Sequence, residues 1–275
     1  MRRSRIFCAF IILLCLVIHA FPCFSAGTSY KTYGKNLYSS LSKRLGKTRA
    51  DYPNLTDEEF ANFREIHTTG IAKGKLYRSS SPISTWGNRN TIADRLSELA
   101  GIKTIINLTD TNHGMTAHKG YSGSYYSRQN VIGLNVSTKF WGKEYQRGLA
   151  KGIRFMAANT PPYLIHCSLG KDRAGFTCAI VECLMGASWQ EVERDYMTSF
   201  YNYFGIVQGT REYDFVVKNE IQGFLARTFG VKAEDIARIN LADYAERYVL
   251  GIGVSSDDIN TLREKLRPYL ILSKE

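Results

Sequence analysis

Short apolar segments alternate with longer amphipathic ones through the middle of the chain. β-Branched or fully apolar strands are predicted at Lys103–Leu108, Val131–Asn135 and Tyr163–His166. Amphipathic helices are predicted between them, at Thr91–Ala100 and Lys143–Ala158. Strands that alternate with helices of this length form parallel sheets. We therefore predict an α/β fold with a small, mainly parallel sheet flanked by helices.

The chain after this alternating part is helical by pattern. Helices are expected at Trp189–Tyr203, Arg211–Phe229, Ala233–Tyr248 and Asp257–Leu272. Residues 27 to about 56 lack clear periodicity, and Thr56 is a suitable cap for a first helical turn. The predicted organisation is a lead-in or linker at residues 26–55 and one domain, with a helical C-terminal half, at residues 56–275.

The first 25 residues have the outline of a secretory signal peptide. Arg2, Arg3 and Arg5 precede an apolar run over Ile6–Phe21, and small residues follow near Ser25. We expect export across the cytoplasmic membrane with cleavage after Ser25. An uncleaved membrane anchor is the alternative, although the run is barely long enough to span a bilayer. Cleavage removes three arginines and no acidic residue, which reduces the net charge from +11 to +8.

The positive net charge suggests one of three kinds of partner: nucleic acid, an anionic membrane surface or a polyanionic small substrate. No zinc-finger spacing, RNA-binding signature or dense basic helix supports nucleic acid, so we expect no such partner. The mildly basic stretch Lys31–Arg49 is interpreted as a solvated linker, and peripheral contact with an anionic membrane is the second interpretation. The sequence does not indicate an oligomeric state.

Cysteine usage singles out one residue. Three of the six cysteines lie in the signal peptide, and the mature part keeps Cys167, Cys178 and Cys183. An odd set of three thiols is no disulfide framework. We therefore expect Cys167 to be kept for chemistry and the other two to fill apolar space on a helix.

The candidate chemistry lies in the run from His166 to Gly175. An apolar strand leads into Cys167, a loop that contains Gly170, then Arg173 and a helix predicted at Phe176–Met185. In such a loop successive backbone N–H groups turn inward, and the helix N-terminus adds the positive end of its dipole. This field favours the thiolate of Cys167, while the guanidinium of Arg173 can bind two phosphate oxygens. The layout predicts phosphoryl transfer through a phosphocysteine.

Three other kinds of site share parts of this layout. A magnesium-dependent nucleotide loop is disfavoured because Asp172 follows Lys171 where Ser or Thr should bind the metal. A papain-like enzyme is disfavoured because a histidine directly before the cysteine points away from it along a strand. A rhodanese-like sulfurtransferase stays open, although the spacing between cysteine and arginine favours a phosphatase.

The run resembles the His-Cys-x5-Arg active-site loop of the protein tyrosine phosphatase superfamily. Its Gly-Lys-Asp-Arg interior is similar to the bacterial atypical dual- or triple-specificity branch that also acts on phosphoinositides. The start of the domain also resembles that branch, at Asn62–Arg64 and Gly74–Ser79. By this resemblance Arg78 would lie near the pocket. The alternative is that Arg78 is a surface charge at the end of a strand. The resemblance implies a tyrosine phosphatase-like fold without metal or cofactor. Its substrates would be phosphorylated proteins, phosphoinositides or inositol phosphates.

The resemblance also implies residue roles. Cys167 attacks phosphorus, and Arg173 with the loop backbone holds the phosphate oxygens. The leaving group needs a proton, which either Asp172 or Asp110 would donate, with Asp172 slightly preferred. His166 would support the thiolate, and Lys171 would add a charge at the rim. The expected substrate-binding residues are His166, Ser168, Leu169, Gly170, Lys171, Ala174 and Gly175.

Ala174 departs from the pattern of the superfamily. Most members carry Ser or Thr there, whose hydroxyl steadies the departing thiolate when water cleaves the phosphocysteine. We therefore predict a phosphoenzyme that forms faster than it breaks down, with Thr177 as a conceivable substitute. Ala174 also supports the alternative of a pseudophosphatase that binds phosphate without turnover.

Overall fold

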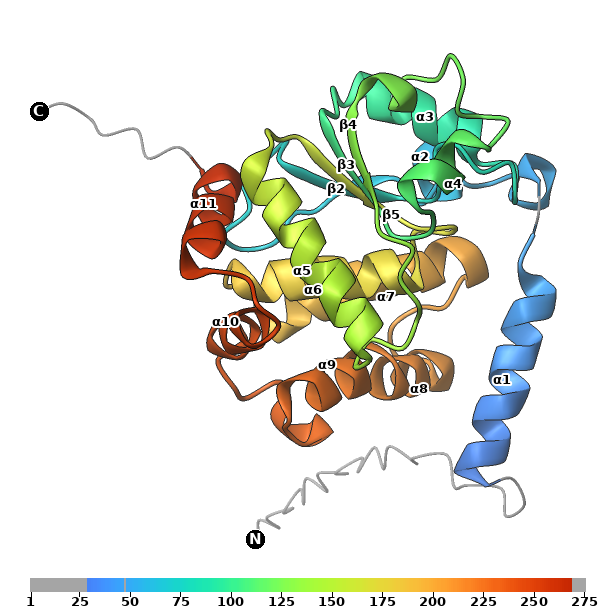
Figure 1. Ribbon diagram of the computed structural model, residues 1–275. Coiled ribbons are helices and arrows are strands. Elements are labelled where there is room, and N and C mark those ends of the chain that lie inside the picture. Colours follow the sequence, from blue (N-terminus) through green and yellow to red (C-terminus); the bar gives the residue numbers. More distant parts are fainter. Residues whose placement is uncertain (1–28, 47, 269–275) are drawn as a thin grey trace, which may run out of the picture.

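A five-stranded sheet lies at the centre of the computed structural model, which describes residues 29–46 and 48–268 (Figure 1). The strands in chain order are β1 (Arg64–Glu65), β2 (Leu76–Ser79), β3 (Thr104–Asn107), β4 (Asn130–Gly133) and β5 (Tyr163–His166). Their spatial order is β1-β2-β5-β3-β4, and all neighbours pair in parallel except β1, which is antiparallel to β2. The predicted mainly parallel sheet is confirmed. The predicted signal peptide at residues 1–25 lies outside the described residues.

The central strand β5 delivers the cysteine to the edge where ligands bind in such sheets. All four of its residues are buried, and its last residue, His166, lies level with Ser79 of β2 and Asn107 of β3. The chain therefore leaves β2, β3 and β5 at one edge. In open α/β sheets this carboxyl edge is where binding loops gather.

Helices cover both faces of the sheet (Figure 1). Side chains alternate along each strand, so Leu164 and Ile105 pack with α3 (Asn90–Leu99) on one face. Tyr163 and Ile165 pack in the larger core of the other face. That core is built by α5 (Lys143–Ala158), α6 (Asp172–Leu184), α7 (Trp189–Phe204), α8 (Arg211–Asn219), α9 (Ile221–Phe229), α10 (Leu241–Gly251) and α11 (Ser256–Leu266). The short helices are η1 (Arg49–Asp51), α2 (Asp57–Phe60), α4 (Asn112–Thr116), η2 (Tyr126–Arg128) and η3 (Ala233–Asp235).

Most predicted elements are present, and several helices differ from their predicted bounds. α5 and β5 have the predicted bounds, whereas α6 begins at Asp172 rather than Phe176. The helix predicted over residues 211–229 is broken at Glu220, whose backbone leaves the helical region. The helix predicted from residue 233 is replaced by η3 and α10, and α11 ends at Leu266.

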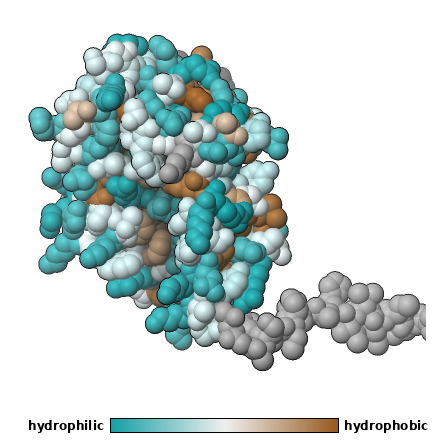
Figure 2. Space-filling view, turned by 90° about the vertical axis from the view of Figure 1, so that its right-hand side faces the viewer, coloured by the Kyte–Doolittle hydropathy of each residue, from teal (hydrophilic) through white to brown (hydrophobic). Residues whose placement is uncertain are grey.

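Residues 29–55 are not the solvated linker that the sequence suggested. They contain α1 (Tyr30–Arg44), which buries Gly34, Leu37 and Leu41. A methyl group on Gly34 would collide with the ring of Phe215 in α8, so the two helices approach closely there. The lysines of α1 point to solvent, on a face that is mostly hydrophilic with scattered apolar residues (Figure 2). Within the described residues, no helix is both long and apolar enough to cross a membrane.

Candidate active site

The loop from Cys167 to Lys171 joins β5 to α6 and carries the predicted nucleophile. Cys167 is only 3% exposed at the end of β5. α6 starts at Asp172, so Arg173 lies in its first turn and the helix N-terminus lies behind the loop. Cys178 and Cys183 are buried and free on α6, as expected for apolar filler.

Buried donors hold the loop carbonyls from outside. The Leu169 carbonyl accepts hydrogen bonds from Asn62 Nδ2 at 3.0 Å and from the Tyr203 hydroxyl at 2.7 Å. The Gly170 and Lys171 carbonyls accept from Arg78 Nη2 at 2.7 and 3.0 Å. The Ser168 carbonyl accepts from the backbone N–H of Ser81 at 3.2 Å.

These contacts fix the direction of the loop N–H groups. In a planar trans peptide the N–H points opposite to the carbonyl of the preceding residue. With the carbonyls of residues 168–171 directed outward, the N–H groups of residues 169–172 are directed to the inside of the loop. Several inward N–H groups beside a helix N-terminus form an anion-binding cradle.

Gly170 is required for this shape. Its φ is +69°, a conformation that favours glycine. A Cβ there would clash with the Ser79 carbonyl oxygen and would lie 2.8 Å from the Ser80 nitrogen. The loop therefore rests directly on the end of β2. Gly175 serves packing in a similar way, since a Cβ would lie 2.6 Å from Arg78 Nη2.

Arg78 belongs to a buried ion cluster behind the loop, which we call the rear cluster: Arg64, Arg78 and Asp195. Asp195 pairs with Arg78 and, at 2.7 Å, with Arg64. Burial alone would raise the pKa of Asp195, but the two guanidinium groups hold it below its usual value. Of the two interpretations of Arg78, the structure supports proximity to the pocket, because its side chain is fully buried against the loop.

A further acid, Glu182 of α6, is buried close to the rear cluster. Its two carboxyl oxygens have no hydrogen-bond partner in the described part of the chain. Burial raises the pKa of Glu182 well above its usual value, with the charge of Asp195 acting in the same direction. Burial therefore favours the neutral form of this carboxyl group.

Arg173 spans the open side of the loop. Its Nη2 donates to Ser168 Oγ at 3.1 Å, and its Nη1 donates to the carbonyls of Leu108 and Val136 at 3.3 and 3.4 Å. Leu108 and Val136 follow β3 and β4, so the guanidinium is oriented by the same sheet edge that presents Cys167. A planar guanidinium fixed at the mouth of a cradle suits a tetrahedral oxyanion.

His166 lies beneath the cysteine and is fully buried. Its Nε2 lies 3.2 Å from the Tyr126 hydroxyl, and its Nδ1 lies 3.5 Å from the Cys167 carbonyl oxygen. Burial lowers the pKa of His166 to about 4. Its support for Cys167 is therefore that of a neutral imidazole.

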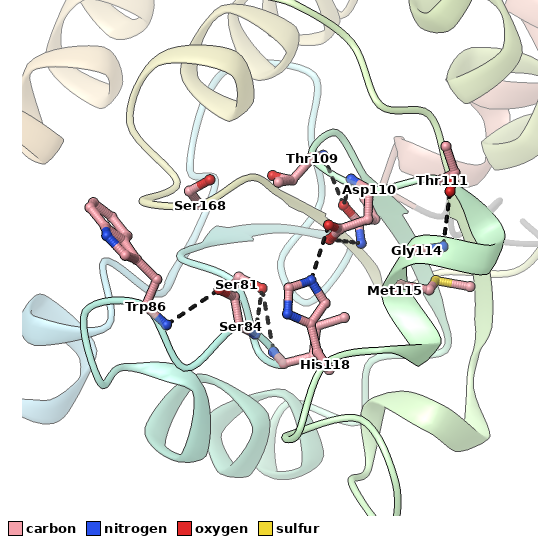
Figure 3. A network of polar contacts seen from close by, with 12 residues as sticks. Ser81, Ser84, Trp86, Thr109, Asp110, Thr111, Gly114, Met115, His118 and Ser168 are labelled. Carbon is pink, nitrogen blue, oxygen red and sulfur yellow. Dashed lines mark hydrogen bonds and ion pairs between the residues drawn. The ribbon is translucent and has the colours of Figure 1, made fainter.

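The structure places both candidate acids beside the loop. Asp110 is bound by His118 Nε2 and by Asn107 Nδ2, each at 3.0 Å (Figure 3). Asp172 forms an ion pair with Lys171. His118 approaches Asp110 from the segment after α4, and nothing in the local sequence around it indicated this pairing.

Lys171 does not extend into solvent at the rim. Its side chain is 12% exposed, and its ammonium group lies 4.2 Å from the ring centroid of Phe200 in α7. On the other side of the mouth, Trp86 is 57% exposed on the segment held by Ser81 and Ser84 (Figure 3). Trp86 is therefore an exposed aromatic side chain at the rim, while the lysine faces sideways toward α7.

Ala174 is fully buried, and the conceivable substitute hydroxyl is already used. Thr177 Oγ1 is hydrogen-bonded to the Tyr145 hydroxyl at 2.7 Å inside the core. Neither residue presents a free hydroxyl group to Cys167.

Sequence reasoning missed the contribution of α7 to the site. Asp195, Ser199 and Tyr203 are spaced by four residues and face the loop from one stripe of the helix. Asp195 lies within the predicted helix Trp189–Tyr203, where a single acidic residue is usually exposed, yet its side chain is only 9% exposed. A polar residue in every turn of an otherwise apolar helix face is the signal that could have found this stripe.

A family model described as the tyrosine phosphatase family matches residues 55–268. No curated protein matches the chain.

Proposed function

The chain belongs to the tyrosine phosphatase family, and from this premise we propose that it is an exported phosphatase that hydrolyses phosphate monoesters through a phosphocysteine. The observation that carries the proposal is the cradle, in which outward carbonyls at residues 168–171 leave inward N–H groups around Cys167. The substrates proposed are phosphotyrosine proteins, phosphoinositides or inositol phosphates. No metal or cofactor takes part in the proposed mechanism.

In the first step the thiolate of Cys167 attacks phosphorus and the bond to the leaving oxygen breaks. The loop N–H groups and Arg173 stabilise the three equatorial oxygens. Asp172, or Asp110 in its place, donates a proton to the leaving oxygen. In the second step water attacks the phosphocysteine, the same carboxylate accepts the proton of the water, and the thiolate leaves.

The second step is proposed to be slow. Ala174 offers no hydroxyl to the departing thiolate, and the Thr177 hydroxyl is bound to Tyr145. We expect a burst of leaving group in the first turnover, followed by a slower steady rate, in rapid-quench measurements. The absence of a burst would contradict this order of rates. The same feature supports the second candidate function, a pseudophosphatase that binds phosphate groups without turnover.

The experiment that tests the function is phosphate release by purified residues 27–275. The substrates are a phosphotyrosine peptide, a phosphoinositide panel and inositol hexakisphosphate, with EDTA present. We expect Cys167→Ser to abolish release and Cys178→Ser, a matched change of a buried thiol on α6, to retain it. Release that survives Cys167→Ser would refute the cysteine mechanism. Binding without release would favour the pseudophosphatase, and sulfur transfer would favour the sulfurtransferase.

Export and membrane contact are part of the proposal. The arginine-rich, apolar start of the chain supports export, and the exposed Lys31, Lys35 and Lys43 of α1 support peripheral contact with anionic lipid. Retention of the unprocessed chain in the producing cell would contradict export.

A further inference from the structure

Glu220 is a buried carboxyl group at the break between α8 and α9. Its side chain is 8% exposed, and its backbone has φ −104° and ψ −96°, outside the helical region. The carboxyl group accepts a hydrogen bond from the Tyr196 hydroxyl of α7 at 2.7 Å. No glycine or proline explains the break, which turns this side chain toward α7.

The same face of α7 receives the Lys171–Asp172 half of the cysteine loop. Tyr196 and Phe200 are one turn apart with ring centroids 5.9 Å apart, and the Lys171 ammonium lies over Phe200. Glu220 interacts electrostatically with Lys171 and with Asp172. We call Lys171, Asp172 and Glu220 the side cluster. Lys171 forms its ion pair with Asp172, and the charge of Glu220 acts on both groups.

α1 reaches this cluster through Tyr38. The Tyr38 ring packs against Phe215 with centroids 6.2 Å apart, and its hydroxyl interacts with the Glu220 carboxyl group. Burial raises the pKa of Glu220, while Lys171 and the two tyrosine hydroxyls oppose that shift. α1 precedes residue 55, so this contact lies outside the part of the chain that the family model matches.

We propose that Glu220 is a positioning residue for the Lys171–Asp172 pair, and that Tyr38 of α1 holds Glu220 in place. The inference rests on the proposed function with Asp172 as the proton donor. Glu220 attracts Lys171 from the α7 side, and Lys171 carries Asp172 with it through their ion pair. Without Glu220, the carboxyl group of Asp172 would sample positions away from the leaving oxygen.

The test compares two substrates of similar size that differ in leaving group. p-Nitrophenyl phosphate releases a stable anion that needs little help from an acid, whereas phenyl phosphate releases a phenolate that needs a proton. The value measured is kcat/KM, which covers the steps up to phosphoenzyme formation, so slow hydrolysis of the phosphocysteine does not hide the effect.

With phenyl phosphate we expect Glu220→Gln to lower kcat/KM about tenfold and Tyr38→Phe to lower it about threefold. Both losses are smaller than the roughly hundredfold that a well-placed acid contributes, because Asp172 itself remains. With p-nitrophenyl phosphate both variants should stay within about twofold of the wild-type protein. The double variant should fall no further than Glu220→Gln alone, because Tyr38 acts through Glu220.

Tyr33→Phe is the matched control. Tyr33 also lies on α1 and packs on Phe215, with centroids 5.1 Å apart, but its buried hydroxyl has no hydrogen-bond partner among the described residues. Its removal should leave both substrates unaffected. Tyr38→Phe decides the question even if Glu220→Gln fails to fold, because it removes one oxygen atom from a partly buried ring.

Equal losses with the two substrates, or no loss with phenyl phosphate, would show that Glu220 and Tyr38 are structural only. This outcome differs from failure of the proposed function, in which the wild-type protein itself releases no phosphate that depends on Cys167.

Discussion

Two groups of charges surround the cysteine loop, and they act on different parts of it. The rear cluster (Arg64, Arg78 and Asp195) binds backbone carbonyls, is buried, and is anchored in β1, β2 and α7. The side cluster (Lys171, Asp172 and Glu220) lies where the loop joins α6 and is partly open to water, since the Asp172 side chain is 40% exposed. The shape of the cradle is therefore set by the core, whereas the side cluster is the group that we propose to position the proton donor.

The largest expected effect comes from a substitution that breaks the rear cluster. Arg78→Met removes one of the two guanidinium partners of Asp195 and the side-chain donor to two loop carbonyls inside the core. We expect a loss of about 3–5 kcal/mol in the free energy of unfolding, measured in urea. Lys171→Met removes a positive charge from the side cluster, where the ion pair is partly exposed, and should cost about 1 kcal/mol or less. Equal losses in the free energy of unfolding for Arg78→Met and Lys171→Met would contradict the distinction between the two clusters.

Acid weakens the support beneath the cysteine. The pKa of His166 is about 4 in the folded protein against 6.5 as its ordinary value, so the unfolded chain binds the proton more readily between these values. Stability contributed by the neutral imidazole is complete above pH 6.5 and is lost as pH falls toward 4. We expect His166 to account for roughly 2 kcal/mol of lost stability between pH 7 and pH 5.

The measurement is the free energy of unfolding at both pH values for the wild-type protein and for His166→Gln. The variant cannot take up this proton, so its stability should depend less on pH by that amount. An unchanged pH dependence would mean that His166 is not held neutral by burial.

The smallest expected effect comes from removing one hydrogen bond at the rear of the loop. Tyr203→Phe deletes the hydroxyl that binds the Leu169 carbonyl, which still accepts from Asn62. We expect a loss of about 1 kcal/mol in stability and at most about a fivefold loss in kcat/KM. Tyr201→Phe, on an exposed neighbour, is the control and should change neither value. A larger loss of stability or kcat/KM for Tyr201→Phe than for Tyr203→Phe would contradict this prediction, because the exposed side of α7 would then matter more than its contact with the loop.

The sheet and the loop were predictable because local pattern and packing agree there. β5 is a continuous apolar run bounded by Pro162 and the cysteine loop, and α5 keeps one apolar face over its whole length. The spacing of Cys167, Gly170 and Arg173 also identifies the cradle, because each residue type is needed for a local physical reason. Membership of the tyrosine phosphatase superfamily and the fold class could therefore be predicted from the sequence and are confirmed.

The contributions from distant residues could not be predicted in this way. Arg78 and Asp195 are charged residues whose burial depends on each other and on Arg64, far apart in sequence. The break at Glu220 depends on partners in α7 and α1 rather than on a helix-breaking residue. α1 itself exposes most of its length and is held by a few contacts with α8, so its own periodicity is weak.

The packing of Phe215 has a consequence for solubility. The rings of Tyr30, Tyr33 and Tyr38 lie with centroids 4.8, 5.1 and 6.2 Å from that of Phe215 and cover it. A chain that began at residue 55, where the family match begins, would keep the sheet and the cysteine loop but would expose this phenyl ring to water. An uncovered aromatic patch promotes self-association. Such a shortened protein would be prone to aggregation even though every residue of its cradle remained in place.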